Sequence, residues 1–396
     1  MAEEFLALQK QGTWHLEPPP PNAQVLGCKW TFHKKFNADG SIARFKARLV
    51  AQGNQQAHGI DYAETFSPVA KIPTIRVLFT VALFHSWTVQ QWDVSNAFLH
   101  GQLNDTVYMN QPWWFTDENY PNHVCRLLKS IYGLRQAPRQ WYTMFTNHLL
   151  KLGFDYSKAD PSLLTLHRDK TRIFLLVYVD DILVTSNDDK AISSVLMELQ
   201  SKFNMKDLGP AHHFLGIKIQ KHSDKYFLSQ SSYAESILSS VNLNNCNPLS
   251  NPSCTKLPDQ MPDDAILSDP TTYRRVTGSL QYLTLTRPDI THAVNVLAQH
   301  LHDPTPQHSY LLKRLLRYIK GTVKLGLPIL PGPLTLSTYS DADWAGDPNT
   351  RKSTTGHCTF LDNTLISWTV KKQNTVARSS TESEYRALAA ATADTI

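Results

Sequence analysis

Two adjacent aspartates lie in the middle of a strongly apolar stretch of the sequence. Asp180 and Asp181 follow Tyr178 and Val179, with apolar residues before them at 173–177 and after them at 182–184. Taking a charged group out of water costs several kcal/mol for each ion unless the charge is compensated. The pair must therefore lie at the tip of a hairpin or bind something positive. A hard divalent cation such as Mg²⁺ is held by carboxylate oxygens together with substrate phosphates.

A third carboxylate lies in another apolar segment upstream. Asp93 is close to the end of the strand that we expect at 88–94. If that strand lies beside the strands around Asp180 and Asp181, the three side chains converge. Three carboxylates with two Mg²⁺ ions, or Mn²⁺ as a substitute, suit in-line phosphoryl transfer to a 3′-hydroxyl with pyrophosphate as the leaving group. In the alternative interpretation, the pair forms an ordinary turn and Asp93 caps a helix.

The surrounding pattern indicates the elements that would position these side chains. Alternating apolar and polar residues at 29–36 and 42–50, around an Asp-Gly turn at 37–40, predict a β-hairpin rich in cations. Further predictions are a strand hairpin at 173–186, a short strand at 214–219, a β-β-β-α unit after 333, and helical stretches at 74–84, 127–152, 192–203, 273–301 and 310–320.

Charge and cysteine content limit the classes of protein to which this chain can belong. The net charge is +5, and no acid occurs between Glu118 and Asp155 or between Asp303 and Asp341, although both stretches carry cations. Such one-sign stretches fit a surface that follows phosphates, or equally two solvated faces. The five cysteines form no C-x-x-C pair, which argues against a disulfide framework or a zinc module and predicts a reducing compartment. No signal peptide opens the chain, and the apolar run at 173–179 is too short to cross a membrane.

An ordered series of motifs makes the sequence resemble the Pol polyprotein of copia-type retrotransposons, over nearly the whole chain. The motifs are KARLVAQG at 46–53, DYAETFSPV at 61–69, QWDVSNAFL at 91–99, YGLRQAPRQW at 132–141, YVDD at 178–181, FLGI at 214–217 and GSLQYL at 278–283. The resemblance implies an α+β fold of the right-hand polymerase type, with fingers, palm and thumb, a connection segment and a truncated ribonuclease H-like α/β unit. The implied domains are fingers and palm at 1–217, thumb and linker at 218–262, connection at 263–333 and the ribonuclease H-like part at 334–396.

The resemblance also assigns residues. It makes Asp93, Asp180 and Asp181 the catalytic, metal-binding carboxylates, and it places Phe98 at the steric gate that selects deoxynucleotides; an ordinary core phenylalanine is the alternative. Gln136 falls in a segment that contacts template and nucleotide.

Lys46 and Arg48, on the basic hairpin, are expected to meet the triphosphate, although solvated cations would look the same. Phe214, Leu215 and Gly216 resemble the primer grip, where glycine would let the backbone approach the primer phosphate. A simple strand kink is the alternative for this glycine.

The C-terminal part resembles a ribonuclease H domain through YSDADW at 339–344, ISW at 366–368, KKQ at 371–373 and SSTESEY at 379–385. The match makes Asp341 and Glu382 two of its metal-binding carboxylates, while Ser379 and Glu382 also have the spacing of a helix capping box. A complete domain has further strands, helices and two more carboxylates, and this chain stops at Ile396. We therefore expect no RNA cleavage by this segment alone.

The activity that the resemblance implies is RNA-directed DNA polymerase. Its partners would be an RNA template, a DNA primer, the RNA–DNA hybrid and deoxynucleoside triphosphates, and no membrane would be involved. The implied location is intracellular and cytoplasmic, in virus-like particles, with delivery of the product to the nucleus. A non-catalytic, nucleic-acid-binding relic is the alternative, and another palm-fold nucleotidyltransferase such as a cyclase is a third reading.

Several departures from the family pattern bear on that choice. Trp113-Trp114-Phe115 replaces the usual glycine before phenylalanine, His212-His213 replaces an aromatic pair, and Lys218 stands where an acid is common. These substitutions favour a decaying element copy, whereas the intact carboxylates favour an enzyme.

Overall fold

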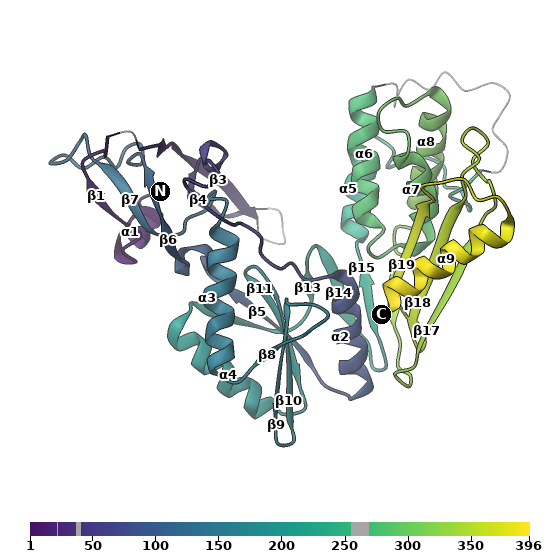
Figure 1. Cartoon of the computed structure of the whole chain (residues 1–396), viewed down its shortest axis with the longest axis horizontal. Coiled ribbons are helices and arrows are strands. Elements are labelled where there is room, and N and C mark those ends of the chain that lie inside the picture. The colour runs from purple at the N-terminus through teal and green to yellow at the C-terminus, as the bar shows by residue number, and fades with distance from the viewer. Residues whose placement is uncertain (22, 37–40, 255–268) are drawn as a thin grey trace. The chain divides into compact units, whose positions relative to one another are not determined.

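The computed structural model describes residues 1–21, 23–36, 41–254 and 269–396 of a mixed α/β chain (Figure 1). The chain divides into two compact units, and each is described by itself. The first unit comprises Met1–Lys71 and Gln90–Gly209, and the second comprises Ile72–Val89 and Pro210–Ile396. Among the helices in the described ranges, none is long and apolar enough to cross a membrane.

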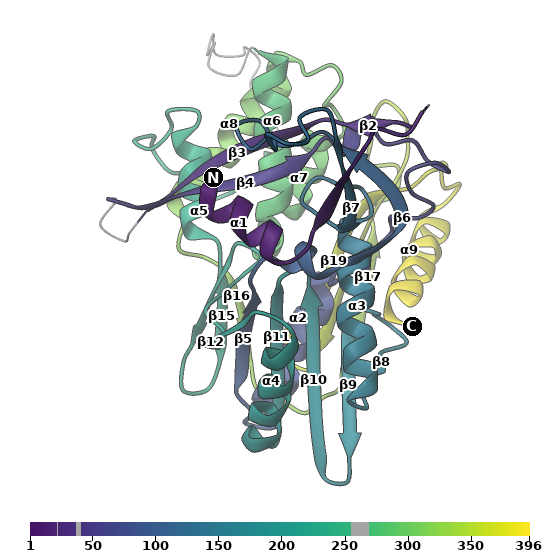
Figure 2. The same cartoon turned by 90° about the vertical axis from the view of Figure 1, so that its left-hand side faces the viewer.

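The first unit is built on a six-stranded sheet with the order β12-β5-β11-β10-β9-β8. Its strands are β5 (Val89–Val94), β8 (Asp155–Tyr156), β9 (Leu163–Arg168), β10 (Thr171–Tyr178), β11 (Asp181–Ser186) and β12 (Met205–Pro210). Helices α3 (Ala137–Lys151) and α4 (Asp189–Lys202) share one apolar cluster with β5, β9, β10 and β11, so both helices cover the same face (Figure 2). The predicted strand hairpin at 173–186 and the helix at 192–203 are confirmed.

The buried faces follow directly from the spacing of the apolar residues. Trp141, Phe145 and Leu149 are four residues apart on α3, and all three are buried, as helical periodicity requires. Helix α4 begins where the Asp188 side chain accepts hydrogen bonds from the backbone N–H groups of Lys190 and Ala191.

The rest of the first unit holds the predicted basic hairpin. Strands β3 (Cys28–Phe36) and β4 (Ile42–Ala51) are antiparallel, with Lys29 opposite Val50 and His33 opposite Lys46. The predicted Asp-Gly turn at 37–40 lies outside the described residues. Around the hairpin are α1 (Ala2–Lys10), η1 (Gly53–Gln55), η2 (Ala97–His100) and a sheet of order β1-β7-β6-β2, made of Trp14–Glu17, Val124–Lys129, Gln102–Met109 and Val25–Leu26.

The prediction of a largely helical stretch at 127–152 is wrong in its first part. Leu127 belongs to β7, where it is buried and lies opposite Val107 and Trp14. The helix starts at Ala137, and Pro138 lies in its first turn. Backbone N–H groups in the first turn have no acceptor within the helix, so a proline there costs no hydrogen bond. A short apolar run is compatible with either a strand or a helix. In this chain, pairing with β1 and β6 makes it a strand.

The second unit combines helices with two small sheets. The helices are α2 (Ile72–Phe84), α5 (Ser231–Ser239), α6 (Pro270–Leu283), η4 (Pro288–Ile290), α7 (Thr291–Ala298), α8 (Pro306–Gly321) and α9 (Ser380–Thr395). One sheet has the order β13-β14-β15-β16, made of His213–Phe214, Ile217–Lys221, Tyr226–Ser229 and Leu327–Ile329. The other has the order β17-β18-β19, made of Leu336–Ala342, Thr354–Leu361 and Thr364–Lys372, which together with α9 confirms the predicted β-β-β-α unit.

Two expectations for the second unit need correction. The predicted strand at 214–219 is a tight hairpin, because Phe214 pairs with Ile217 across a turn. The predicted helical stretch at 273–301 is interrupted after Leu283 and resumes at Thr291, because Pro288 lacks the N–H that a continuous helix needs.

A buried arginine explains why residues 72–89 belong to the second unit. Arg76 of α2 donates hydrogen bonds to the carbonyls of Ile366 and Leu285, both at 2.7 Å, and its guanidinium lies 3.9 Å from the centre of the Trp368 ring. Burial lowers the pKa of Arg76 to about 9. One side chain thus joins α2, the segment after α6 and strand β19. The boundaries of the four predicted domains remain predictions beside this coarser division.

Candidate catalytic carboxylate site

The candidate site is centred on the turn of the β10–β11 hairpin. Tyr178 pairs with Asp181, so Val179 and Asp180 form a two-residue turn. Val179 has a φ of 54°, which is costly for a β-branched side chain. The Trp141 indole N–H of α3 donates a 2.7 Å hydrogen bond to the Val179 carbonyl and holds the turn in place. Backbone strain that the surrounding structure maintains in this way is concentrated at functional sites.

Asp93 lies beside this turn, as the sequence predicted. Strand β5 is the neighbour of β11 in the sheet, and the Val94 N–H donates a 2.9 Å hydrogen bond to the Asp180 carbonyl. Asp93, Asp180 and Asp181 are all partly buried. The predicted adjacency of the two strands is therefore confirmed.

The three carboxylates repel one another in a partly dehydrated setting. Burial, followed by the charges of Asp180 and Asp93, raises the pKa of Asp181 to about 6, and a hydrogen bond from Gln91 acts in the opposite direction. Burial also raises the pKa of Asp180, and Asp93 adds to the effect. The site is thus short of positive charge, which is the condition that a bound cation relieves.

Two cations of the basic hairpin act on the same site. The charges of Arg48 and Lys46 partly counter the rise in the Asp180 pKa. The Arg48 guanidinium also lies 4.6 Å from the centre of the Tyr132 ring, and that ring packs edge-on against Phe98 with centroids 5.2 Å apart. Phe98, Tyr132 and Arg48 therefore form a continuous row. Sequence reasoning overlooked Tyr132, although it opens the quoted motif at 132–141.

A cavity of about 280 Å³ opens between the hairpin and the residues that follow Asp93. Its charged lining comprises the cations Arg44, Lys46 and Lys206 together with two acids, Glu3 and Glu4 of α1, and its polar lining includes Ser95 and Asn96. The three lysine and arginine side chains outnumber the two glutamates, which leaves an excess of positive charge on this lining, and phosphate oxygens are the anionic groups that accompany metal-bound carboxylates. Arg44, Asn96 and Lys206 were not predicted from the sequence. Nothing local distinguishes them, because the tertiary fold alone gathers them.

The donor chemistry of the site fits magnesium, although the side chains do not already form a closed cage. Across the described residues, no three His, Cys, Asp or Glu side chains are grouped tightly enough to hold a metal by themselves. Mg²⁺ is usually bound by one or two carboxylates together with waters and substrate phosphates, so a protein cage is not required. Asp93, Asp180 and Asp181 offer the oxygen ligands, and burial together with the neighbouring aspartates raises the pKa values of Asp180 and Asp181.

Gln136 does not present its side chain to a substrate in this structure. It is fully buried, its amide donates a 2.9 Å hydrogen bond to the Asp61 carbonyl, and it accepts a 3.0 Å hydrogen bond from Gln56. These bonds tie the start of α3 to the segment after β4. The substrate-binding role of Gln136 stays a prediction, and the observed role of its side chain is structural.

The predicted primer-grip residues form the turn between β13 and β14 in the second unit. Phe214 is buried, Leu215 is partly exposed and Gly216 is exposed. Leu215 and Gly216 have φ values of 50° and 67°. The glycine prediction thus has a conformational basis, because the second turn position lies in the left-handed region.

In the predicted ribonuclease H-like part at 334–396, Glu382 lies in the first turn of α9, whose N-cap is Ser379. It accepts hydrogen bonds from the backbone N–H of Arg378 at 2.7 Å and from the Arg386 side chain at 2.6 Å, while Ser379 accepts one from the Glu382 N–H at 3.1 Å. Asp341 is exposed on β17. A metal-binding role for Asp341 and Glu382 stays a prediction, and the contacts of Glu382 stabilise the start of α9.

The basic stretches noted in the sequence are partly used inside the protein. Arg139 pairs with Glu64 at 2.8 Å, and Arg135 donates to the Gly53 carbonyl at 2.9 Å. Arg314 and Arg317 of α8 bind the carbonyls of Ser253 and Asn247. These four cations stabilise loops. The number of cations in the two stretches is therefore larger than the number that can bind phosphates.

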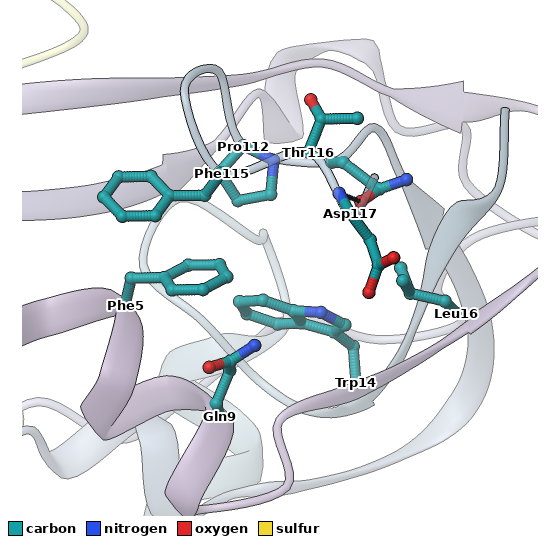
Figure 3. Close-up of a pocket in the computed structure, with 9 residues that line it drawn as sticks. Phe5, Gln9, Trp14, Leu16, Pro112, Phe115, Thr116 and Asp117 are labelled. Atoms are coloured by element: carbon teal, nitrogen blue, oxygen red, sulfur yellow. Dashed lines mark hydrogen bonds between the residues drawn. The ribbon is translucent and has the colours of Figure 1, made fainter. Parts of the chain in front are cut away.

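A second cavity, of about 490 Å³, lies in the first unit between α1, β1 and the loop after β6 (Figure 3). Phe5 stacks on Phe115 there with centroids 4.4 Å apart, and Trp14 and Asp117 also line it. Its lining includes one acid and no lysine or arginine. It therefore lacks the charge that metal-dependent phosphate chemistry needs, in contrast to the smaller cavity beside Asp93.

Comparison with known proteins shows the family. A family model described as reverse transcriptase (RNA-dependent DNA polymerase) matches residues 11–255. The chain therefore belongs to the reverse transcriptase family.

The curated relatives specify the branch. The chain is 48% identical over 391 residues to the Retrovirus-related Pol polyprotein from transposon RE1 of Arabidopsis thaliana, covering 98% of this chain and 27% of that protein. It is 40% identical over 396 residues to the corresponding polyprotein from transposon TNT 1-94 of Nicotiana tabacum, covering 97% of this chain and 30% of that protein. These matches identify it as the reverse transcriptase part of a copia-type retrotransposon Pol polyprotein. The chain spans less than a third of the length of either relative.

Proposed function

We propose that this chain is an RNA-directed DNA polymerase that adds deoxynucleotides to a primer 3′-hydroxyl by two-metal phosphoryl transfer. One observation supports the proposal most strongly: Asp93, Asp180 and Asp181 lie together at a strained turn that the Trp141 hydrogen bond holds in place. The positive charges of Lys46 and Arg48, on the basic hairpin, lower the pKa of Asp180. Family membership points to the same chemistry.

In this proposal Asp93, Asp180 and Asp181 hold two Mg²⁺ ions, with Mn²⁺ as a possible replacement. The ions, when bound, lower the pKa of the attacking hydroxyl and neutralise charge on the leaving pyrophosphate. The protein contributes the orientation of the carboxylates, which the Trp141 hydrogen bond to the Val179 carbonyl maintains.

The cations next to the carboxylates would bind the triphosphate of the incoming nucleotide. Lys46 and Arg48 are the predicted contacts, and Arg44 and Lys206 join Lys46 in the lining of the neighbouring cavity. Phe98 would lie against the sugar and exclude a 2′-hydroxyl, because its ring is fixed by Tyr132 and has little freedom to withdraw.

The partners in this proposal are an RNA template, a DNA primer and the hybrid that they form. The exposed face of the β13–β14 hairpin carries Gly216 and Lys218, which suit contact with a phosphodiester backbone. A right-hand arrangement of fingers, palm and thumb is part of the same proposal.

A non-catalytic relic is the second candidate, and one observation favours it. Trp114 has a φ of 67°, at a place where the family pattern has glycine nearby. A side chain in that conformation costs roughly 1–2 kcal/mol, which a decaying copy could accumulate without selection.

Single-nucleotide addition tests the proposal against the relic. The rate would be measured for the parent chain, for Asp93→Asn and for Asp155→Asn, an exposed carboxylate on β8 that serves as the matched control. We expect addition by the parent and the control and none by Asp93→Asn, because the metal loses a charged ligand. Near-parental addition by Asp93→Asn would overturn the site, and primer–template binding without addition by any chain would favour the relic.

A further inference from the structure

The turn between β13 and β14 has an unusual backbone. Its two central residues, Leu215 and Gly216, have φ values of 50° and 67°, the left-handed pair that a type I′ turn requires. Glycine adopts this conformation at no steric cost, whereas leucine does not. A turn with leucine at this position needs support from outside the hairpin.

The support comes from Tyr282 of α6. Its hydroxyl donates a hydrogen bond to the Leu215 carbonyl. A Cβ built on Gly216 would lie 2.6 Å from the same hydroxyl oxygen, so this oxygen touches both central residues of the turn. The Tyr282 ring is held in turn by Tyr233 of α5, edge-on with centroids 5.1 Å apart.

Helix α6 is anchored independently of this contact. Leu280 and Leu283 on the same helix are buried in the apolar core that α5, α6, α7 and α8 share. The Tyr282 hydroxyl therefore projects from a fixed element onto a strained turn. Figure 1 shows α5 and α6 side by side above the strands of this unit.

The hairpin offers its other side to solvent. Phe214 and Ile217 are buried beneath the turn, while His213, Gly216 and Lys218 are exposed. His213 and Lys218 are directly opposite each other across the strands. Burial and the charges of His212 and Lys218 lower the pKa of His213, so Lys218 carries the positive charge on this face. That charge favours an anion, and the exposed Gly216 allows a phosphodiester to approach the backbone closely.

We propose that Tyr282 is the positioning residue of this turn: its hydroxyl fixes the Leu215–Gly216 backbone in the shape that contacts the primer strand. The inference rests on the proposed function and gives a role to the motif at 278–283, which that function leaves unassigned. Tyr282 acts through the turn and need not touch the substrate.

The first test replaces only the hydroxyl. In Tyr282→Phe, the Kd for an RNA–DNA primer–template should rise by about five-fold, the usual effect of one lost hydrogen bond, with an unchanged KM for deoxynucleotide at saturating primer–template. Tyr233→Phe is the matched control, since its hydroxyl makes no hydrogen bond within the described residues. Equal effects of the two variants, or a rise confined to the deoxynucleotide KM, would overturn the proposal.

A second test uses the contact with Gly216. In Gly216→Ala the new Cβ meets the Tyr282 hydroxyl at 2.6 Å, whereas without that oxygen the nearest ring atom is at an ordinary 3.6 Å. The loss of affinity caused by Gly216→Ala should thus be several-fold smaller in a Tyr282→Phe background, while the cost of the positive φ is the same in both. Strictly additive effects would refute the geometry.

The two proposals fail in different ways. A parent chain that binds primer–template but adds no nucleotide removes the polymerase function, and the affinity measurements still decide the role of Tyr282. A parent chain that extends primers, with a Tyr282→Phe variant of equal affinity, removes the positioning role alone. A parent chain with no affinity for primer–template overturns both.

Discussion

Replacing Asp181 by asparagine should stabilise the protein in the absence of metal. The folded state raises the pKa of this carboxyl from 3.8 to about 6, by burial and by repulsion from Asp180 and Asp93. The folded form therefore keeps its proton at pH values where the unfolded chain has lost it. The group costs nothing below pH ~4, and its cost grows as the pH rises to ~6 and persists above that. Asparagine has nearly the same shape and carries no charge.

The magnitude follows from the size of the shift. Two pKa units correspond to roughly 3 kcal/mol, and partial exposure to solvent reduces this to about 1–2 kcal/mol. For a unit of this size, that difference raises the thermal midpoint by about 2–8 °C. The gain should be present at about pH 8 and absent near pH 4, where the parent side chain is already neutral.

The assay is thermal unfolding of the parent, Asp181→Asn and Asp155→Asn at both pH values, with and without Mg²⁺. Asp155→Asn controls for the loss of an exposed charge on the same sheet. Added Mg²⁺ should raise the midpoint of the parent more than that of Asp181→Asn, because a bound ion relieves the same repulsion. An Asp181→Asn variant that is no more stable than the parent at the higher pH, or equally stabilised at both, would refute this reasoning.

Three further predictions concern individual residues. Trp114→Gly should raise the free energy of unfolding in urea by about 1 kcal/mol, because glycine adopts the left-handed φ of this position without strain and the lost side chain is 73% exposed. A lower free energy of unfolding would show that contacts of the Trp114 ring stabilise the fold. Phe98→Val should increase ribonucleotide relative to deoxynucleotide incorporation by roughly 10- to 100-fold in competition assays, and unchanged sugar selectivity would remove the gate. Gln136→Leu should lower the free energy of unfolding by about 2–3 kcal/mol, since the Asp61 carbonyl and the Gln56 amide lose a buried partner, and a neutral effect would contradict the structural role.

The sequence predicted the central hairpin well because its physical constraints are local. Two charges inside a long apolar run can be reconciled with burial only at a turn, and the pairing of Tyr178 with Asp181 confirms this. The neighbouring position of Asp93 was a conditional prediction, and the Val94 hydrogen bond to the Asp180 carbonyl satisfies its condition. Period-two and helical patterns likewise located the basic hairpin and α4.

The errors arose where distant contacts determine the structure. Leu127 belongs to a strand because β1 and β6 flank it, which no local pattern reveals. The turn at Leu215 required a left-handed leucine, and the Tyr282 hydroxyl that supports it lies far away in sequence. Lys206 reaches the cavity beside the carboxylates through the order of the sheet, since β12 is the neighbour of β5.

The central claim is tested most directly by extension of a DNA primer on an RNA template with Mg²⁺ and deoxynucleotides. The purified chain would be compared with an Asp180→Asn/Asp181→Asn variant of equal primer–template affinity. The account predicts template-dependent extension by the parent and none by the variant. Equal extension by both would refute the carboxylate site, and binding without extension by either would mean that the chain is a nucleic-acid-binding relic rather than a polymerase.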